Sequence, residues 1–270
     1  MIQTLYLGRV DYDEALRLQA EVAALVAEGR AQNVLLLLEH PPVLTLGRNA
    51  DRTNILASDE LLAQRGVTVH EINRGGDVTY HGPGQLVGYP IFDLRTLRTA
   101  CGNRMGPVDF VRGMEEALIR LCGGFGVQAG RIRGLTGVWC GSSGAERKIA
   151  AIGIHVARGI TSHGFAFNVT TDLSDFELIV PCGIADHAVT SLEREVAKAV
   201  QLPGLEAVAH QAARCFGQIF DQQVLALESL EALRAQAEAA QPQFPAEDTP
   251  MRIPDEVERL LGCVERPVRA

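Results

Sequence analysis

Cys182 is the residue whose surroundings best suit covalent chemistry. It stands between Pro181 and Gly183, after an apolar run at residues 176–180, in a turn whose backbone amides could stabilise a thiolate. A thiolate is a good nucleophile, whereas most protein cysteines are inert small hydrophobic residues. We therefore expect Cys182 to be reactive and the other five cysteines to be unreactive, namely Cys101, Cys122, Cys140, Cys215 and Cys263.

Lys148 could act on such a nucleophile. The chain contains only two lysines, Lys148 and Lys198, and Lys148 stands at the start of an apolar strand. Lysine can lose its proton in a protein and serve as a base, which arginine cannot do. Two interpretations stay open: Lys148 guards a strand edge in solvent, or it points inward, where burial favours its neutral form.

A glycine-rich stretch at residues 74–90 could bind a ligand. Five glycines and two prolines alternate there with strand-forming residues. The spacing misses the dinucleotide-binding pattern by one residue and no helix follows it, so a nucleotide-binding fold is not indicated. Glycines let a ligand lie close to the backbone, although tight turns alone would also explain them. Arg74, Asp77, Tyr80 and His81 favour a binding site, because a plain turn needs none of them.

Composition and charge exclude several classes of function. The 270 residues are 47% apolar and 21% charged, with a net charge of -8, which predicts a soluble globular chain of one large domain, with or without an appendage. An acidic chain is a poor binder of nucleic acid, and its longest apolar runs fall far short of the ~18 residues of a membrane span. The start of the chain does not resemble a signal peptide, and the scattered cysteines indicate reduced thiols in the cytoplasm. Without a close cluster of histidines and cysteines, no metal site is expected.

These residues must be positioned by an α+β fold. Apolar periodicity predicts helices at residues 13–28, 58–65, 107–122 and 204–220. Strand patterns occur at residues 34–39, 43–46, 67–72, 137–140, 149–156 and 160–169, and the last three indicate a β-meander. The sheet is therefore expected to be predominantly antiparallel or mixed and to be flanked by helices. Residues 1–220 are predicted to form the main domain and residues 221–270 a C-terminal extension with helices at 226–240 and 255–261.

Four separated segments resemble one enzyme family, the lipoyl(octanoyl) transferases. They are residues 74–85 with Tyr89 and Pro90, residues 147–153, residues 163–169, and residues 181–184 with 189–192. The resemblance covers roughly residues 1–220 and implies the α+β fold that this family shares with lipoate and biotin protein ligases. It also implies a step of lipoate biosynthesis, in which an octanoyl group passes from octanoyl-acyl carrier protein to the target lysine of lipoyl domains.

The same resemblance assigns roles to residues. Cys182 would be the nucleophile that carries the acyl group as a thioester, and Lys148 would lower its pKa. The substrate-binding residues would be Arg74, Gly75, Gly76, Asp77, Val78, Thr79, Tyr80, His81, Ala151, Ile152, Gly153, Gly164, Phe165 and Ala166. No cofactor is implied, because the acyl group arrives on the phosphopantetheine of the carrier protein. We further expect a monomeric, cytoplasmic enzyme that binds neither nucleic acid nor membrane.

Two features depart from the family pattern, and two other functions compete with it. His155 stands where an arginine is common, and the chain after Asp221 is longer than usual. An ATP-dependent lipoate or biotin ligase of the same fold would use Lys148 on a phosphate and would not need Cys182, and a non-catalytic acyl- or domain-binding protein would need neither residue. Docking of an acidic carrier protein on this acidic chain would require an arginine cluster, for which the candidates are Arg48, Arg52, Arg74, Arg131, Arg133, Arg147 and Arg158.

Overall fold

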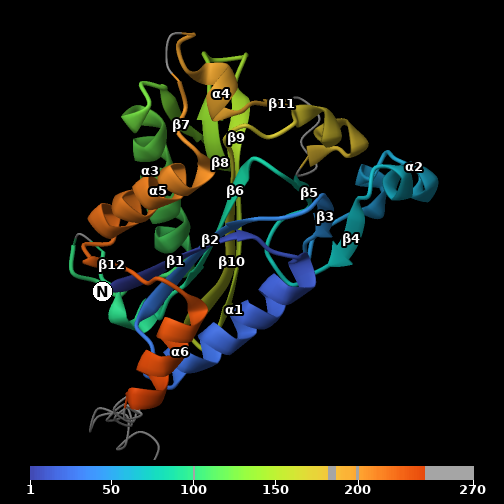
Figure 1. The fold of residues 1–270 in the computed structure, drawn as a ribbon. Helices are drawn as coiled ribbons and strands as arrows, with labels where there is room; N and C mark the ends of the chain where they lie inside the picture. Colours follow the sequence, from blue (N-terminus) through green and yellow to red (C-terminus); the bar gives the residue numbers. More distant parts are fainter. Residues whose placement is uncertain (100, 182–186, 199–200, 241–270) are drawn as a thin grey trace, which may run out of the picture.

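A mixed sheet forms the centre of the molecule (Figure 1). The computed structural model describes residues 1–99, 101–181, 187–198 and 201–240. Within them, the nine-stranded sheet contains β12 (Val224–Ala226), β1 (Ile2–Arg9), β2 (Asn33–Glu39), β6 (Gln85–Ile91), β10 (Ile160–Asn168), β9 (Arg147–Ala157), β8 (Leu135–Cys140) and β7 (Ala129–Ile132) in that order, and β11 (Ala188–Val189) pairs with β9. The pairs β1–β2, β1–β12 and β9–β11 are parallel and the others antiparallel, so the predicted mixed sheet is confirmed.

The predicted β-meander is present as β8, β9 and β10. The three strands pair antiparallel in chain order, and β9 lies between the other two. Since β9 begins at Arg147, earlier than the apolar pattern indicated, Lys148 lies inside the strand. It is 7% exposed and pairs with Trp139 of β8 on one side and with Val189 of β11 on the other. The interpretation of Lys148 as an edge guard is therefore wrong.

A second, smaller sheet stands beside the first. It consists of β4 (Thr68–Glu71), β3 (Val43–Leu46) and β5 (Val78–His81), and the chain enters it from β2 through the corner at Pro41 and Pro42. Its own apolar cluster includes Leu44, Tyr80 and Phe176. Three short helical segments lie along this part of the chain, namely η1 (Arg52–Asn54), α2 (Asp59–Gln64) and η3 (Leu173–Leu178).

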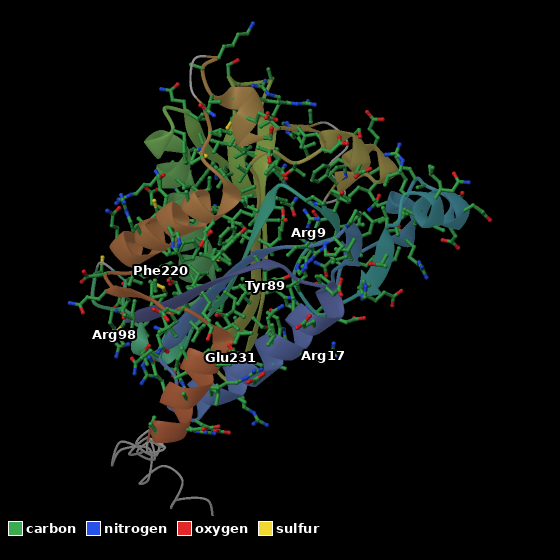
Figure 2. All side chains as sticks on the ribbon, in the orientation of Figure 1. Arg9, Arg17, Tyr89, Arg98, Phe220 and Glu231 are labelled. Carbon is green, nitrogen blue, oxygen red and sulfur yellow. The ribbon has the colours of Figure 1, made fainter. Side chains whose placement is uncertain are left out.

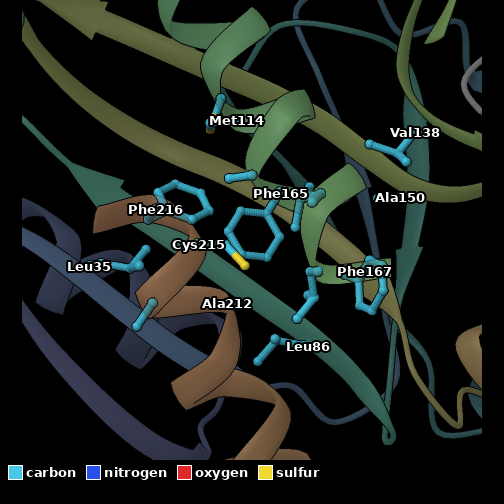
Figure 3. Packing of buried hydrophobic residues seen from close by; sticks show 14 of the residues in the cluster. Leu35, Leu86, Met114, Val138, Ala150, Phe165, Phe167, Ala212, Cys215 and Phe216 are labelled. Atoms are coloured by element: carbon cyan, nitrogen blue, oxygen red, sulfur yellow. The ribbon is translucent and has the colours of Figure 1, made fainter. Parts of the chain in front are cut away.

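Helices cover both faces of the large sheet (Figure 1). On one face, α3 (Pro107–Gly124) and α5 (Leu205–Ile219) enclose the main core, where the rings of Phe165 and Phe216 stack with their centroids 5.5 Å apart (Figure 3). On the other face lie α1 (Tyr12–Ala27) and α6 (Leu230–Ala239), over a second cluster. The remaining short helices are η2 (Leu94–Thr96) and α4 (Leu192–Glu195). Within the described residues, no helix is both long and apolar enough to cross a bilayer.

Sequence periodicity explains how α1 packs. Ala15, Leu18, Val22 and Val26 recur at helical spacing and are all buried against the sheet, as the pattern for residues 13–28 predicted. The helix stops where Gly29 adopts a φ of 68°, a left-handed conformation that suits glycine. Polar side chains such as Arg17 and Glu231 stay on the outside, whereas Tyr89 lies in the interior (Figure 2).

Part of the predicted C-terminal extension belongs to the core fold. β12 pairs in parallel with β1, from Ile2 opposite Val224 to Thr4 opposite Ala226. Helix α6 then packs beside α1 and buries Leu233 and Ala237. Residues 221–240 therefore complete the large sheet and cover one face of it, while the predicted helix at 255–261 lies outside the described residues.

Candidate active site

A cavity of about 270 Å³ lies where the small sheet and the loop at 74–77 meet strands β9 and β10. Lys148 and most of the predicted substrate-binding residues line it, namely Arg74, Gly75, Gly76, Asp77, Thr79, His81, Ala151, Ile152, Gly153, Gly164, Phe165 and Ala166. Segments far apart in the sequence thus share one wall, which makes this cavity the candidate active site.

The floor of the cavity is made of the smallest residues. Ala151 and Gly153 of β9 lie opposite Ala166 and Gly164 of β10, and directly opposed residues in an antiparallel pair point to the same face. None of the four has a side chain larger than a methyl group. The strands therefore leave space above the sheet that is suited to an unbranched apolar chain.

The loop at residues 74–76 lies over this floor, and its backbone is in direct contact with the backbone of β9. Gly75 N donates to Ile154 O at 3.0 Å, and a Cβ added to Gly153 would lie only 2.5 Å from Gly75 O. Gly47 is equally tight, since its Cβ would lie 2.3 Å from Gly76 O. These glycines serve close approach of two chain segments, as well as leaving room for a ligand.

Arg74 and Asp77 hold the ends of that loop. The Arg74 guanidinium is buried and donates from Nη2 to Thr45 O at 2.7 Å. The Asp77 carboxylate accepts from Asn54 Nδ2 at 2.6 Å and from Val78 N at 2.6 Å. Both charged residues therefore shape the cavity wall by bonding to the protein itself.

Side chains along β5 alternate between two faces, so the predicted substrate-binding residues of this strand point in two directions. Thr79 and His81 line the cavity, while Val78 and Tyr80 point to the apolar cluster of the small sheet. The Tyr80 hydroxyl donates to Asp175 Oδ2 at 2.7 Å. Val78 and Tyr80 are thus placed beneath the wall, and the sequence motif did not distinguish them from their neighbours.

Histidines that face the cavity are buried in their neutral form. Burial lowers the pKa of His81 to about 3, and its Nδ1 donates to Gln85 Oε1 at 2.8 Å. Burial, together with the charge of Arg74, lowers the pKa of His163 to about 4. His163 also has a φ of 56°, and its Nε2 donates to Asn73 Oδ1 at 2.7 Å. The cavity wall therefore carries uncharged imidazoles at neutral pH.

Lys148 reaches the same cavity from β9. The residue is only 7% exposed, and its Nζ lies over the ring of Trp139, 4.7 Å from the ring centroid. Lys148 also lines a second, very small cavity of about 10 Å³, together with Pro181 and Val189. It thus lies between the large cavity and the chain on either side of residues 182–186.

Cys182 itself lies outside the described residues, but both flanks of its segment are placed. Pro181, which immediately precedes it, shares the small cavity with Lys148. After the segment, the His187 ring packs on Trp139 with centroids 5.1 Å apart, and Val189 pairs with Lys148. The two ends of the segment therefore both lie beside Lys148.

Three of the four described cysteines lie in surroundings that do not suit a nucleophile. Cys122, Cys140 and Cys215 are buried in the main core. A hydrogen bond with Cys140 and burial raise the pKa of Cys122, and burial raises that of Cys215. Cys101 is exposed, away from the cavity lining.

Several cavity residues were outside the predicted set. Tyr89 and His163 belong to the quoted motifs but carried no predicted role, and Val87 lies within the glycine-rich stretch at residues 74–90. Tyr12, Gly134, Leu135 and Thr136 stand in segments with no motif. Tyr12 begins α1, Gly134 lies in the turn before β8, and Leu135 and Thr136 are the first residues of β8. Only the packing of α1 and β8 around β9 and β10 brings them to the cavity.

The family model of the Lipoyl protein ligase A/B catalytic domain matches residues 11–216, so the chain belongs to this class of proteins. A bi-partite lipoate protein ligase from Thermoplasma acidophilum has a similar structure, with a TM-score of 0.65 and 17% identity over 88% of this chain and 91% of that one. A lipoate-protein ligase A bound with ATP gives a TM-score of 0.63 and 16% identity over 88% and 94%. The predicted ligase-like α+β fold is therefore confirmed.

Sequence relatives narrow the class. The chain is 61% identical over 232 residues to an octanoyltransferase of Acidobacterium capsulatum, covering 85% of this chain and 94% of that protein. It is 53% identical over 260 residues to an octanoyltransferase of Koribacter versatilis, covering 96% and 97%. The chain belongs to the octanoyltransferase family, as its motifs predicted.

Proposed function

We propose that this octanoyltransferase takes its acyl group from octanoyl-acyl carrier protein and delivers it to the target lysine of lipoyl domains, with Cys182 as the acyl carrier. The acyltransferase activity, a step of lipoate biosynthesis, follows from its family. One observation supports the proposed route above others: Lys148, in the wall of the cavity, has both flanks of the Cys182 segment beside it.

The first step would exchange one thioester for another. The Cys182 thiolate attacks the carbonyl carbon of the octanoyl thioester, the bond to the phosphopantetheine sulfur breaks, and that sulfur leaves as a thiolate that takes up a proton. A free thiol is only a few per cent ionised at neutral pH, so a nearby cation is needed to favour the thiolate. Lys148 would supply it. Since the two thioesters have similar energies, neither ATP nor a bound cofactor is required.

The second step would form the amide. The neutral amine of the acceptor lysine attacks the Cys182 thioester, the carbon–sulfur bond breaks, and Cys182 leaves as a thiolate while the nitrogen loses a proton. The amide product is more stable than the thioester, so this step is downhill. The octanoyl chain would lie on the floor formed by Ala151, Gly153, Gly164 and Ala166, where each buried methylene contributes about 0.8 kcal/mol.

Charge constrains where the carrier protein docks. Of the candidate arginines, Arg74 is buried against Thr45, Arg147 is paired with Glu195 at 3.0 Å, and Arg131 is paired with Glu115 at 3.0 Å. The docking surface would then rely mainly on Arg48, Arg52, Arg133 and Arg158, which are exposed. Arg131 is exposed as well, and Arg52 forms only a solvent-exposed pair with Glu71 at 3.7 Å. We also propose a cytoplasmic location, where these partners and reduced cysteines occur together.

Intact-mass measurement tests the proposed route. We expect incubation with octanoyl-acyl carrier protein, without ATP, to add one octanoyl group to the protein and none to Cys182→Ala. The matched control Cys101→Ala should still be acylated, because Cys101 is exposed outside the cavity lining. An adduct that forms only with ATP and free octanoate would indicate a ligase, and no adduct under either condition would refute the acyl-enzyme.

A further inference from the structure

Gln85 and Asn168 form a buried pair of amide side chains between the large cavity and Lys148. They lie directly opposite each other on β6 and β10, and neither is more than 4% exposed. Gln85 Nε2 donates to Asn168 Oδ1 at 2.9 Å. Both residues also line the very small cavity that Lys148 shares with Pro181. Each belongs to one of the motifs noted in the sequence, but neither carried a predicted role.

Backbone carbonyls fix the orientation of both amides. Asn168 Nδ2 donates to Thr190 O at 2.9 Å, and Gln85 Nε2 donates to Tyr80 O at 3.2 Å. A carbonyl oxygen can only accept a hydrogen bond, so in each amide the nitrogen must face the carbonyl. The oxygen of Gln85 then faces His81 Nδ1 at 2.8 Å, and this ring nitrogen must carry the proton. The hydrogen bonds therefore all run in one direction.

The two amides connect separate parts of the site. At one end, His81 lines the large cavity, and its Nε2 lies 3.4 Å from Thr45 Oγ1. Thr45 Oγ1 in turn accepts from Arg74 Nη2 at 2.9 Å. At the other end, Thr190 N donates to Lys148 O at 2.9 Å. We refer to the hydrogen bonds from His81 through Gln85 and Asn168 to Thr190 as the amide bridge.

Burial makes the amide bridge stiff. His81 is 7% exposed and Thr190 is 1% exposed, so water does not readily replace a hydrogen bond that is lost. Removal of one amide would leave its partner buried without a hydrogen bond, which is unfavourable. Thr190 is also held on its other side, since its Oγ1 donates to Glu195 Oε1 at 2.6 Å. The place of β11 beside Lys148 therefore depends on the wall of the cavity.

We propose that Gln85 and Asn168 are positioning residues for octanoyl transfer. The amide bridge would keep a fixed separation between the cavity wall at His81 and the paired strands β9 and β11 at Lys148. An acyl chain held in the cavity would then present its carbonyl group at a constant place relative to Lys148, and such alignment raises the rate of the chemical step. This inference rests on the proposed function, because it takes the cavity as the site of the acyl chain.

Shape-conserving substitutions test the amide bridge. Gln85→Met and Asn168→Leu keep the size of the side chain and remove its hydrogen bonds. We expect each to lower kcat for transfer from octanoyl-acyl carrier protein to a purified lipoyl domain by about 10–100-fold, with little change in KM. Wild-type kcat in either variant would overturn the inference.

A second buried amide pair provides the matched control. Gln3 is 4% exposed and donates from Nε2 to Gln236 Oε1 at 2.7 Å, outside the cavity lining. Gln3→Met should therefore lower stability in urea, as the bridge variants do, but keep the kcat of the wild type. An equal loss of kcat in Gln3→Met would show that any buried amide bond affects the rate through stability alone, and would overturn the positioning role.

The double variant distinguishes one bridge from two independent roles. If the two amides act as a unit, kcat of Gln85→Met combined with Asn168→Leu should lie within about twofold of the slower single variant. Losses that multiply would show that the residues act separately, and the bridge would be wrong.

The tautomer of His81 tests the bridge without altering it. Nitrogen NMR of histidine-labelled wild-type protein at neutral pH should show a protonated Nδ1 and an unprotonated Nε2 at this residue, with His81→Gln identifying its resonances. The opposite tautomer would be incompatible with the hydrogen bond to Gln85 Oε1 and would overturn the bridge.

Failure of this inference can be distinguished from failure of the proposed function. Lys148→Met is assayed beside the amide variants. If Lys148→Met keeps the kcat of the wild type, the proposed route beside Lys148 fails, whatever the amide variants show. If Lys148→Met loses its activity while the amide variants keep theirs, only the role of Gln85 and Asn168 is wrong.

Discussion

Val189 pairs with Lys148 in a two-residue parallel contact between β11 and β9. The contact continues through a hydrogen bond in which Thr190 N donates to Lys148 O at 2.9 Å. The chain that follows residues 182–186 is thus fixed to the strand that carries the lysine. Pro181, which precedes residues 182–186, also lies beside Lys148.

Two substitutions of Lys148 should distinguish the contribution of its charge to activity from the contribution of its side-chain shape. We expect Lys148→Met to lower kcat for octanoyl transfer by roughly 10²-fold or more, because the thiolate loses its counter-ion. Lys148→Arg should also lose most activity, but less than the methionine variant, because the broader guanidinium keeps the charge without fitting between Trp139 and Gly137. Steady-state kinetics on both variants check this order, and wild-type activity in either would remove Lys148 from the mechanism.

The small residues of the cavity floor should control which acyl chains are accepted. Ala166→Val places two extra methyl groups on the floor opposite Ala151. We expect kcat/KM for the octanoyl carrier protein to fall about tenfold relative to a butanoyl carrier protein, as two methylenes lose their burial at about 0.8 kcal/mol each. A chain-length series on the same preparation supplies its own control, and an equal loss for all lengths would place the acyl chain elsewhere.

Residue 153 should have to be glycine, because the loop at residues 74–76 packs directly against it. In Gly153→Ala the new Cβ would meet Gly75 O at 2.5 Å, so the loop must move away from β9. We expect a destabilisation of about 1–3 kcal/mol and a raised KM. Gly130→Ala is the matched control in β7, because its Cβ meets no atom within 4 Å. Urea unfolding of the two variants gives the comparison, and equal stabilities would contradict the close contact.

Buried neutral histidines should make the fold acid-sensitive. Burial lowers the pKa of His40 to about 4, of His81 to about 3 and of His163 to about 4. Below a pH of about 6.5 these histidines bind protons in the unfolded chain but not in the folded one. The free energy of unfolding is therefore at its full value above that pH and decreases as the pH falls toward 4. At pH 5 the loss should be about 2 kcal/mol per histidine.

Urea unfolding at several pH values measures this dependence. His40→Gln should reduce the slope of stability against pH between 6.5 and 5, whatever it does to the absolute stability. His210→Gln is the control, because His210 is exposed on α5 and should leave the slope unchanged. A slope that is the same in all three proteins would show that other groups cause the acid sensitivity.

Local sequence signals were sufficient for most elements. The predicted helix at 107–122 is α3, which begins at Pro107 after Gly106, where Gly106 N donates to Asp109 Oδ2 at 3.0 Å. The meander and the helix at 204–220 were also found close to their predicted limits. Such elements carry their own periodicity and caps, so the pattern of a short window is enough to locate them.

Features that depend on distant partners were not predictable in this way. β1 and β12 were both missed: β12 has only three residues and is defined by its pairing with β1, while β1 is defined by its pairing with both β2 and β12. In the site, the motif at residues 74–81 marked the right segment, but only the pleat of β5 separates Thr79 and His81 from Val78 and Tyr80. Tyr12 and Leu135 joined the cavity through tertiary packing that no local pattern encodes.

The pairing of β1 with β12 has a consequence for how the chain is made. Ile2 donates from its N–H to Gln223 O at 2.7 Å, so one edge of β1 has no strand partner until a segment more than two hundred residues further along the chain has been synthesised. Contacts so distant in sequence form slowly, and synthesis itself adds only about 5–20 residues per second. The edge of the large sheet at β1 is therefore completed only after the strands β9 and β10, which form the cavity floor, have been synthesised.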